Sequence, residues 1–472
     1  MKHVPAQPLW QLSASELAAA YRAGTTTPNT VLRAVLERCE DVNPRLNAVV
    51  TLDSAGAQKA ADASTHRWQA GEAFGPLDGV PVTIKDNILV QGLRATWGSE
   101  LYAEFVPEID EEPVARLRAA GAVILGKTNV PEFTLHGYTD NALFGPTGNP
   151  WNPALTPGGS SGGAVAAVAA GIGAIALCTD GGGSIRRPAA HTGLAGFKPS
   201  RGMVPRANGF PAILHDFEVA GPVARNAGDI ILAMDAICGK SWRRCEPGFA
   251  DPAFAELGFA KTPLRVHYAR TFSSAPVDPM IVAAVDDVAA ELMRQGHNVN
   301  RADSFNLAAP IADVWPVISQ TGLAWLLSQH KDADSAIDPM LADMARNGRA
   351  YSAADYLNAL DIIKHVERDF ERLFDQFDLL LTPATAAMPW PATQSHPTMI
   401  AGHPVGPRGH AVFTPFANAL GLPAISLSCA SWPQNMPIGF QLCAARGRDA
   451  ALLAFAKDYE TRTGWQMRWP LL

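Results

Sequence analysis

Residues 157–187 read PGGSSGG (157–163), an apolar run AVAAVAAGIGAIAL (164–177) and, after one cysteine, TDGGGSIRR (179–187). Two glycine-rich turns, each holding a serine, are thus joined by a segment that is too apolar for a surface loop. Glycine lets the backbone turn at positive φ and lets N–H groups approach a ligand closely. The two turns therefore indicate a place where the backbone meets a ligand, with Ser160 and Ser184 as candidate reactive groups.

The apolar run is a candidate core segment and not a membrane span. No charge occurs from Pro157 to Thr179, but the apolar part proper has 14 residues, and a spanning helix needs about 20. The chain has 472 residues, of which 47% are hydrophobic and 18% charged, which is typical of a globular protein with a large core. This length allows one large α/β domain or two to three ordinary domains.

The charge and cysteine content exclude several classes of function. The net charge is −7, and no basic block is present, which argues against a nucleic-acid partner. The six cysteines are scattered without a CxxC pair, and no histidine cluster has metal-ligand spacing. We therefore expect a reduced protein with no metal and no cofactor. Residues 1–8 lack the apolar region of a signal peptide, which predicts a cytoplasmic protein with no membrane association.

The segments around the central stretch alternate between strand and helix signals. Residues 75–87 (GPLDGVPVTIKDN) form a turn that leads into a short β-branched strand with Lys85 near its end. Acidic residues and a proline at 110–113 predict a helix to Ala120, and residues 121–125 (GAVIL) are typical of a buried strand. This β–α–β pattern predicts an α/β fold. Residues 306–376 are expected to be mostly helical.

Two motifs match known signatures by their letters but not by their context. GAVILGKT (121–128) fits the phosphate-loop pattern, yet an apolar strand directs its N–H groups to neighbouring strands. A nucleotide-binding module resting on Gly121–Thr128 is therefore a less favoured alternative. GGSSG (158–162) fits the GxSxG elbow, which would make Ser160 the nucleophile, but that elbow must follow a buried strand. Residues 149–157 (NPWNPALTP) are instead typical of a loop.

Lys85, Ser160 and Ser184 together offer a third arrangement. A serine hydroxyl attacks a carbonyl only when a base removes its proton, and a buried lysine amine with a lowered pKa can be that base. A second serine between them lets the proton pass along two hydrogen bonds. The glycines at 181–183 supply consecutive N–H groups for an oxyanion. The ordinary alternative for Lys85 is a solvated lysine at a strand end.

These motifs together resemble the amidase signature family of serine hydrolases. The matching segments are GVPVTIKDN (79–87), residues 121–129, NPW (149–151), PGGSSGG (157–163), TDGGGSIRRP (179–188) and GFKP (196–199). The separations of 75 residues between Lys85 and Ser160 and of 24 between Ser160 and Ser184 also agree with that family. The similarity is dense over residues 75–205 and weaker in a C-terminal block over residues 413–442.

The resemblance implies a role for each matched residue. Ser184 would be the acylated nucleophile, Ser160 a bridging serine held after a cis peptide bond, and Lys85 the base that later protonates the leaving amine. The remaining implied residues are Gly181, Gly182 and Gly183, whose N–H groups with that of Ser184 would hold the oxyanion, and Thr179, Asp180 and Arg186 in support. The implied fold is one large α/β domain over residues 1–472, with a mixed central sheet covered by helices on both faces.

We therefore expect hydrolysis of the C–N bond of an amide, an aryl amide or a carbamate (urethane) through an acyl-enzyme on Ser184. A second hypothesis is the glutamine-hydrolysing subunit of a tRNA-dependent amidotransferase, which passes ammonia to a partner protein. Otherwise we expect a small-molecule substrate and a monomer or homodimer. Residues 306–376 and 428–436 are expected to line the pocket, as the family's variable segments do. Arg187 and His191 depart from the less polar residues of many relatives.

Overall fold

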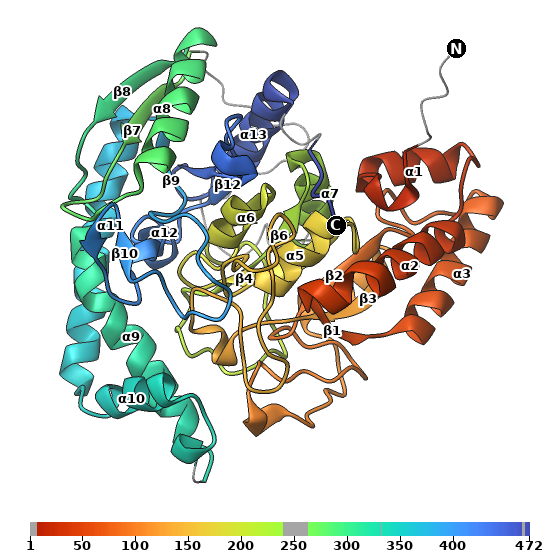
Figure 1. The fold of residues 1–472 in the computed structure, drawn as a ribbon, viewed down its shortest axis with the longest axis horizontal. Coiled ribbons are helices and arrows are strands. Elements are labelled where there is room, and N and C mark those ends of the chain that lie inside the picture. The colour runs from red at the N-terminus through yellow and green to blue at the C-terminus, as the bar shows by residue number, and fades with distance from the viewer. Residues whose placement is uncertain (1–6, 239–262, 332, 465–467) are drawn as a thin grey trace.

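The structure, a computed structural model, describes residues 7–238, 263–331, 333–464 and 468–472. Within these ranges, eleven strands form one sheet that runs through the molecule (Figure 1). In spatial order they are β1 (Val49–Leu52), β3 (Val123–Thr128), β2 (Pro81–Lys85), β4 (Ile175–Asp180), β6 (Val219–Ala224), β5 (Ala195–Lys198), β12 (Ala424–Ser428), β13 (Gly439–Cys443), β9 (Leu379–Pro383), β7 (Arg265–Ala269) and β8 (Asn298–Ala302). A separate hairpin pairs β10 (Met399–Ile400) with β11 (His403–Pro404).

The sheet is mixed. β2 runs parallel to both of its neighbours, β3 and β4, and β7 runs parallel to β8 and β9. The pairs that involve β5, β6, β12 and β13 are antiparallel. A parallel pair needs a crossover connection, and the helix between β2 and β3 supplies one. The predicted α/β fold with a mixed central sheet is therefore confirmed.

Helices flank the sheet along its length, and the whole forms a single α/β domain. They are α1 (Ala14–Arg22), α2 (Pro28–Leu46), α3 (Ser54–Ala70), α4 (Glu112–Ala119), α5 (Gly162–Ala170), α6 (Arg186–Thr192), α7 (Ala227–Cys238), α8 (Pro279–Arg294), α9 (Ala309–Leu327), α10 (Pro339–Gly348), α11 (Ala353–Gln376), α12 (Pro415–Ala419) and α13 (Asp449–Thr463). In Figure 1, α1–α3 lie at one end with β1–β3, whereas α9 packs against α10 and α11 at the other.

The apolar run of the central stretch becomes a buried helix and a buried strand. All nine residues of α5 are buried, as are all six of β4. A helix that is apolar on every side belongs inside a protein. Gly163 allows α5 to pack tightly, because a Cβ there would lie 2.3 Å from the backbone nitrogen of Asn129. The prediction of a core segment is thus confirmed.

The phosphate-loop match lies on β3, between β1 and β2 in the sheet. Its backbone pairs with both neighbours, so it forms no open loop around a phosphate. Lys127, the lysine of the motif, is fully buried, and its Nζ lies 3.1 Å from Oδ1 of the buried Asp86. The other carboxylate oxygen of Asp86 accepts hydrogen bonds from the Thr96 N–H and hydroxyl. The lysine therefore neutralises a buried carboxylate.

The described residues contain no candidate membrane-spanning helix and no candidate metal site. A membrane-spanning helix needs about 20 apolar residues, and none of the described helices combines such length with such apolarity. Among the same residues, no cluster of histidine, cysteine or acidic side chains has an arrangement that could hold a metal ion. The described cysteines are buried free thiols, and Cys245 lies outside the described residues.

We expect Lys127→Met to destabilise the protein, because the Asp86 carboxylate would stay buried without its counter-charge. Breaking a buried ion pair on one side costs about 3–5 kcal/mol of unfolding free energy. Urea denaturation followed by circular dichroism measures this loss. The matched control Lys457→Met, at an exposed position on α13, should change the unfolding free energy by less than about 0.5 kcal/mol. Equal stabilities of the two variants would contradict the ion-pair assignment.

Candidate active site

The two glycine-rich turns meet at one edge of the sheet. β2 ends at Lys85 and β4 ends at Asp180, and these parallel neighbours pair in register at Ile84 and Leu177. The carboxyl ends of parallel strands share an edge, which is where ligands bind in open α/β sheets. The turn after β4 leads into α6, and the turn before α5 lies against it, since the Ser161 N–H donates to the Ser184 carbonyl at 3.3 Å.

Lys85 is fully buried, in contrast to an ordinary solvated lysine at a strand end. Its Nζ contacts three oxygens: Ser160 Oγ at 2.8 Å, Thr179 Oγ1 at 2.9 Å and the Thr179 carbonyl at 3.2 Å. Asn87 contacts the same hydroxyl: its Nδ2 donates to Thr179 Oγ1 at 3.0 Å, and the hydroxyl lies 3.3 Å from Asn87 Oδ1 as a possible acceptor. A neutral amine has two N–H donors and one lone pair. The two Thr179 oxygens can use the donors, which leaves the lone pair for the Ser160 proton.

The burial of this amine changes its acidity. Loss of solvation disfavours the charged form and lowers the pKa of Lys85 to about 8, against the opposite influence of Glu218, Cys178 and Asp180. A lysine with a pKa near 8 is partly neutral at physiological pH. Burial therefore shifts the Lys85 amine towards its neutral form, which is the form that a base requires.

The two serines differ in their surroundings. Ser160 is buried below the surface and follows a cis peptide bond with Gly159, as the resemblance implied. Ser184 lines a cavity. In the described part of the chain, no hydrogen bond joins the hydroxyls of Ser160 and Ser184, and the Ser184 hydroxyl has no hydrogen-bonded partner. The structure thus forms the first link of the predicted relay, between Lys85 and Ser160, and leaves the second link open.

The glycine turn presents free N–H groups, though not at every predicted position. Among the described residues, no acceptor bonds the N–H groups of Gly181, Gly182 or Ser184. The N–H of Gly183, by contrast, donates to Asp180 Oδ1 at 2.7 Å. The expectation that all three glycines offer free N–H groups therefore does not hold for Gly183, because the chain folds back so that this N–H anchors the turn to the end of β4.

A buried ion pair holds the turn in place. Arg186 donates to both carboxylate oxygens of Asp180, at 2.8 and 3.0 Å, and both side chains are fully buried. Burial alone would raise the pKa of Asp180, but the Arg186 guanidinium reverses this effect and holds that pKa well below its usual range. Arg186 also donates to Asn418 Oδ1 at 2.6 Å and to the Thr414 carbonyl at 3.0 Å. The predicted supporting residues thus lie together beside Ser184.

Sequence analysis missed three polar residues of this region as individual site residues. Asn87 orients Thr179, and Thr414 and Asn418 hold the turn through Gly182 O and Arg186. Asn87 lies two residues after Lys85 in the quoted motif, so its position was a usable signal. Thr414 and Asn418 lie more than 220 residues from the turn. Their distance along the chain explains why motif spacing did not find them.

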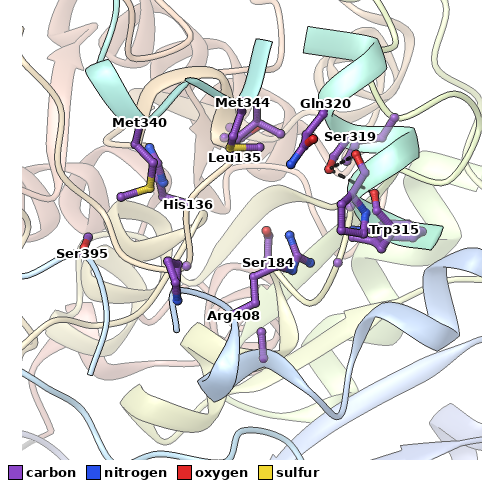
Figure 2. Close-up of a pocket in the computed structure, with 18 of the residues that line it drawn as sticks. Leu135, His136, Ser184, Trp315, Ser319, Gln320, Met340, Met344, Ser395 and Arg408 are labelled. Carbon is purple, nitrogen blue, oxygen red and sulfur yellow. Dashed lines mark hydrogen bonds between the residues drawn. The ribbon is translucent and has the colours of Figure 1, made fainter. Parts of the chain in front are cut away.

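The cavity beside Ser184 has a volume of about 300 Å³. Figure 2 shows Ser184 between Arg408 and a wall that includes Trp315, Ser319 and Gln320 of α9 and Met340 and Met344 of α10. Within residues 306–376, α9 and α10 contribute side chains to the cavity wall, whereas α11 packs against α9 and contributes none of the lining residues.

The prediction that residues 428–436 line this cavity is wrong. Trp432 in this segment stacks edge-on against Trp151 and donates to Ser428 Oγ at 2.9 Å. The segment therefore packs against the loop around Trp151, and the cavity is bordered instead by Ser395, Pro407, Arg408, His410 and Ala411. Of the two polar departures that follow Ser184, Arg187 lines the cavity, and His191 is buried with its Nε2 3.1 Å from the Ala387 carbonyl oxygen.

Comparisons with known proteins agree over nearly the full length of the chain. A family model described as Amidase matches residues 30–453. An acylamidase of Rhodococcus erythropolis is 32% identical, over 98% of this chain and 98% of its own. A glutamyl-tRNA(Gln) amidotransferase subunit of Moorella thermoacetica is 33% identical, over 98% of this chain and 99% of its own. A solved bacterial aryl acylamidase of the amidase signature family has a TM-score of 0.88 at 27% identity, over 97% of this chain and 98% of that one.

Substitution by alanine should lower the stability of the protein at Gly183 but not at the neighbouring Gly182. Gly183 has a φ of +113°, and a Cβ there would lie 2.1 Å from Thr414 Oγ1, so we expect Gly183→Ala to lose at least about 1–3 kcal/mol of unfolding free energy. At Gly182 the nearest atom, Trp315 Nε1, would lie 3.5 Å away, so Gly182→Ala should keep nearly full stability. Urea denaturation of both variants tests this. Equal stability would mean that the turn differs from the one described.

Proposed function

The chain belongs to the amidase signature family and is an amide-hydrolysing enzyme, and from this premise we propose that Ser184 is its nucleophile and Lys85 its base. The observation that carries the mechanism is the fully buried Lys85 amine, 2.8 Å from Ser160 Oγ, beside a cavity lined by Ser184. Few structural roles require a desolvated lysine amine against a serine hydroxyl. A base that removes a serine proton requires both.

In the proposed first half-reaction, Ser184 Oγ attacks the carbonyl carbon of the amide. The Ser184 proton passes to Ser160, and the Ser160 proton passes to the lone pair of Lys85. The Ser184 hydroxyl has no hydrogen bond to break among the described residues, so it is free to turn towards Ser160. The free N–H groups of Gly181, Gly182 and Ser184 face the developing oxyanion, whose stabilisation is usually the largest contribution of such a site.

Collapse of the tetrahedral intermediate breaks the C–N bond. The proton held by Lys85 returns through Ser160 to the leaving nitrogen, which departs as a neutral amine. Water then attacks the acyl ester on Ser184, gives a proton to the same relay and releases the carboxylic acid. Lys85 is neutral again, and both hydroxyls are restored. Asp180 and Arg186 take no proton in this cycle and act by holding the turn.

Two further substrates, carbamates and glutamine, are compatible with this chemistry. A carbamate presents the same carbonyl to the same nucleophile, so urethane cleavage is part of the proposal. Glutamine hydrolysis for a partner protein is favoured by the 33% identity to a glutamyl-tRNA(Gln) amidotransferase subunit. A glutaminase assay on the isolated chain, beside aryl amides, primary amides and carbamates, separates these candidates.

We expect Ser184→Ala to lose at least about 10³-fold in kcat/KM on every cleaved substrate, because no other group can form the acyl-enzyme. Mass spectrometry after rapid quenching should find the acyl group on the peptide that contains Ser184. Ser161→Ala is the matched control, since its hydroxyl contacts the Thr179 carbonyl, at 3.3 Å, and the buried Cys178 thiol but lies outside the proposed proton path, and it should keep activity within about tenfold. Near wild-type turnover by Ser184→Ala would refute the assignment of the nucleophile.

The activity should rise with pH as Lys85 loses its proton. Burial lowers the pKa of Lys85 to about 8, and a base acts in its deprotonated form. We therefore expect kcat/KM to increase about tenfold per pH unit below pH 8 and to level off above it. Initial rates between pH 5.5 and 10 measure this profile. Lys85→Met should remove both the activity and the inflection, and a flat wild-type profile from pH 6 to 9 would contradict the role of Lys85.

A further inference from the structure

Two arginines lie beside the proposed nucleophile, at the turn residue Gly182. Arg187 donates from NH1 to the Gly182 carbonyl at 2.8 Å. Arg408 places its NH2 3.8 Å from the position that a Cβ on Gly182 would occupy. Both residues line the same cavity as Ser184, and Figure 2 shows Arg408 close to Ser184. Two positively charged side chains therefore lie at the cavity wall beside Gly182, which precedes Ser184 by two residues.

Neither guanidinium is neutralised by the protein. In the described part of the chain, Arg187 makes no ion pair, although only 5% of its surface is exposed. Its acceptors are neutral oxygens: Gly182 O, Thr414 Oγ1 at 3.4 Å and Gly159 O at 3.5 Å. Its Nε–H has no acceptor among these residues. Arg408 is exposed and likewise has no hydrogen-bonded or ion-paired side-chain partner there. A buried charge without a counter-charge is costly unless a ligand pairs with it.

The rest of the cavity wall offers no counter-charge. Apart from these arginines, the described lining residues are apolar or neutral, His136 and His410 included, and none of them is an aspartate or glutamate. The nearby acids are already paired, Asp180 with Arg186 and Glu218 with Arg206. Burial, followed by the charge of Arg408, lowers the pKa of Arg187 to about 9. The cavity is therefore a positively charged one that is open to a ligand.

We propose that the natural substrate is an amide that carries a carboxylate, and that Arg187 and Arg408 bind this carboxylate while Ser184 attacks the amide. This inference rests on the proposed function. A guanidinium binds a carboxylate through charge-assisted hydrogen bonds, and these are about twice as strong as neutral ones. The same cavity has no acid to pair with an ammonium group. An amide of a dicarboxylic acid therefore fits better than glutamine, whose α-ammonium would face Arg187 and Arg408 without a partner.

The kinetic test compares two anilides of equal length, glutaric acid mono-4-nitroanilide and its methyl ester. We expect wild-type kcat/KM to be at least tenfold higher for the free acid. Arg408→Gln should reduce kcat/KM for the acid at least tenfold and change that for the ester less than threefold. The control Arg368→Gln, at an exposed site on α11, should change neither. Equal rates for acid and ester in the wild type, or an equal loss of both in Arg408→Gln, would overturn the proposal.

A binding test decides the inference independently of turnover. Calorimetric titration of Ser184→Ala with glutarate should show binding, whereas neutral glutaramide should bind at least tenfold more weakly. Adding Arg408→Gln or Arg187→Gln to Ser184→Ala should weaken glutarate binding at least tenfold, with an unchanged melting temperature as the check on folding. Absence of glutarate binding would refute the carboxylate site. Cleavage of the ester but not of the acid would also refute the carboxylate site and would leave the proposed hydrolase function intact. Glutarate binding without cleavage of either anilide would refute the hydrolase function and leave the carboxylate site intact.

Discussion

The burial of one lysine amine is the constraint on which this site depends. Lys85 ends a strand in the interior of the sheet, and among the described residues its Nζ forms hydrogen bonds with Ser160 and Thr179 alone. Each of these partners comes from a different part of the central stretch, so the two turns must both be in place for the amine to be satisfied. Desolvation then lowers the pKa of the amine into the range of a useful base. The same three contacts therefore tie the two turns to the end of β2 and place the amine against Ser160.

A second buried charge, Asp180, gives the turn its shape. Its carboxylate binds Arg186 and accepts the N–H groups of Gly183 and Ile185. Since these donors lie on both sides of Ser184, the carboxylate fixes the backbone around the proposed nucleophile without touching it. The cost of burying the carboxylate is offset by this pairing. The N–H groups of Gly183 and Ile185 are bound in this way, whereas those of Gly181 and Gly182 remain available to an oxyanion.

The positive charge that remains in the cavity comes from residues outside this network. Arg186 is paired, whereas its neighbour Arg187 and the distant Arg408 are not, within the part of the chain that the structure describes. Adjacent arginines in one short helix thus have opposite roles, because α6 directs one into the protein and the other to the cavity wall. If Ser184 is the nucleophile as proposed, this positive charge would favour anionic ligands in addition to any selection by the shape of the α9 and α10 wall.

The sequence alone determined the class of fold and the buried nature of residues 164–177, because these depend on local patterns: apolar runs and glycine clusters. The family resemblance implied that Lys85 and Ser160 act together, but these residues lie 75 positions apart, and only the packing of the strands brings them into contact. The tertiary structure decided what depends on distant segments. It showed that Gly183 anchors the turn, that Thr414 and Asn418 complete it, and that residues 428–436 lie away from the cavity. Local composition predicts which segments are buried. The hydrogen-bond partner of a buried polar group, however, depends on how the strands and helices pack.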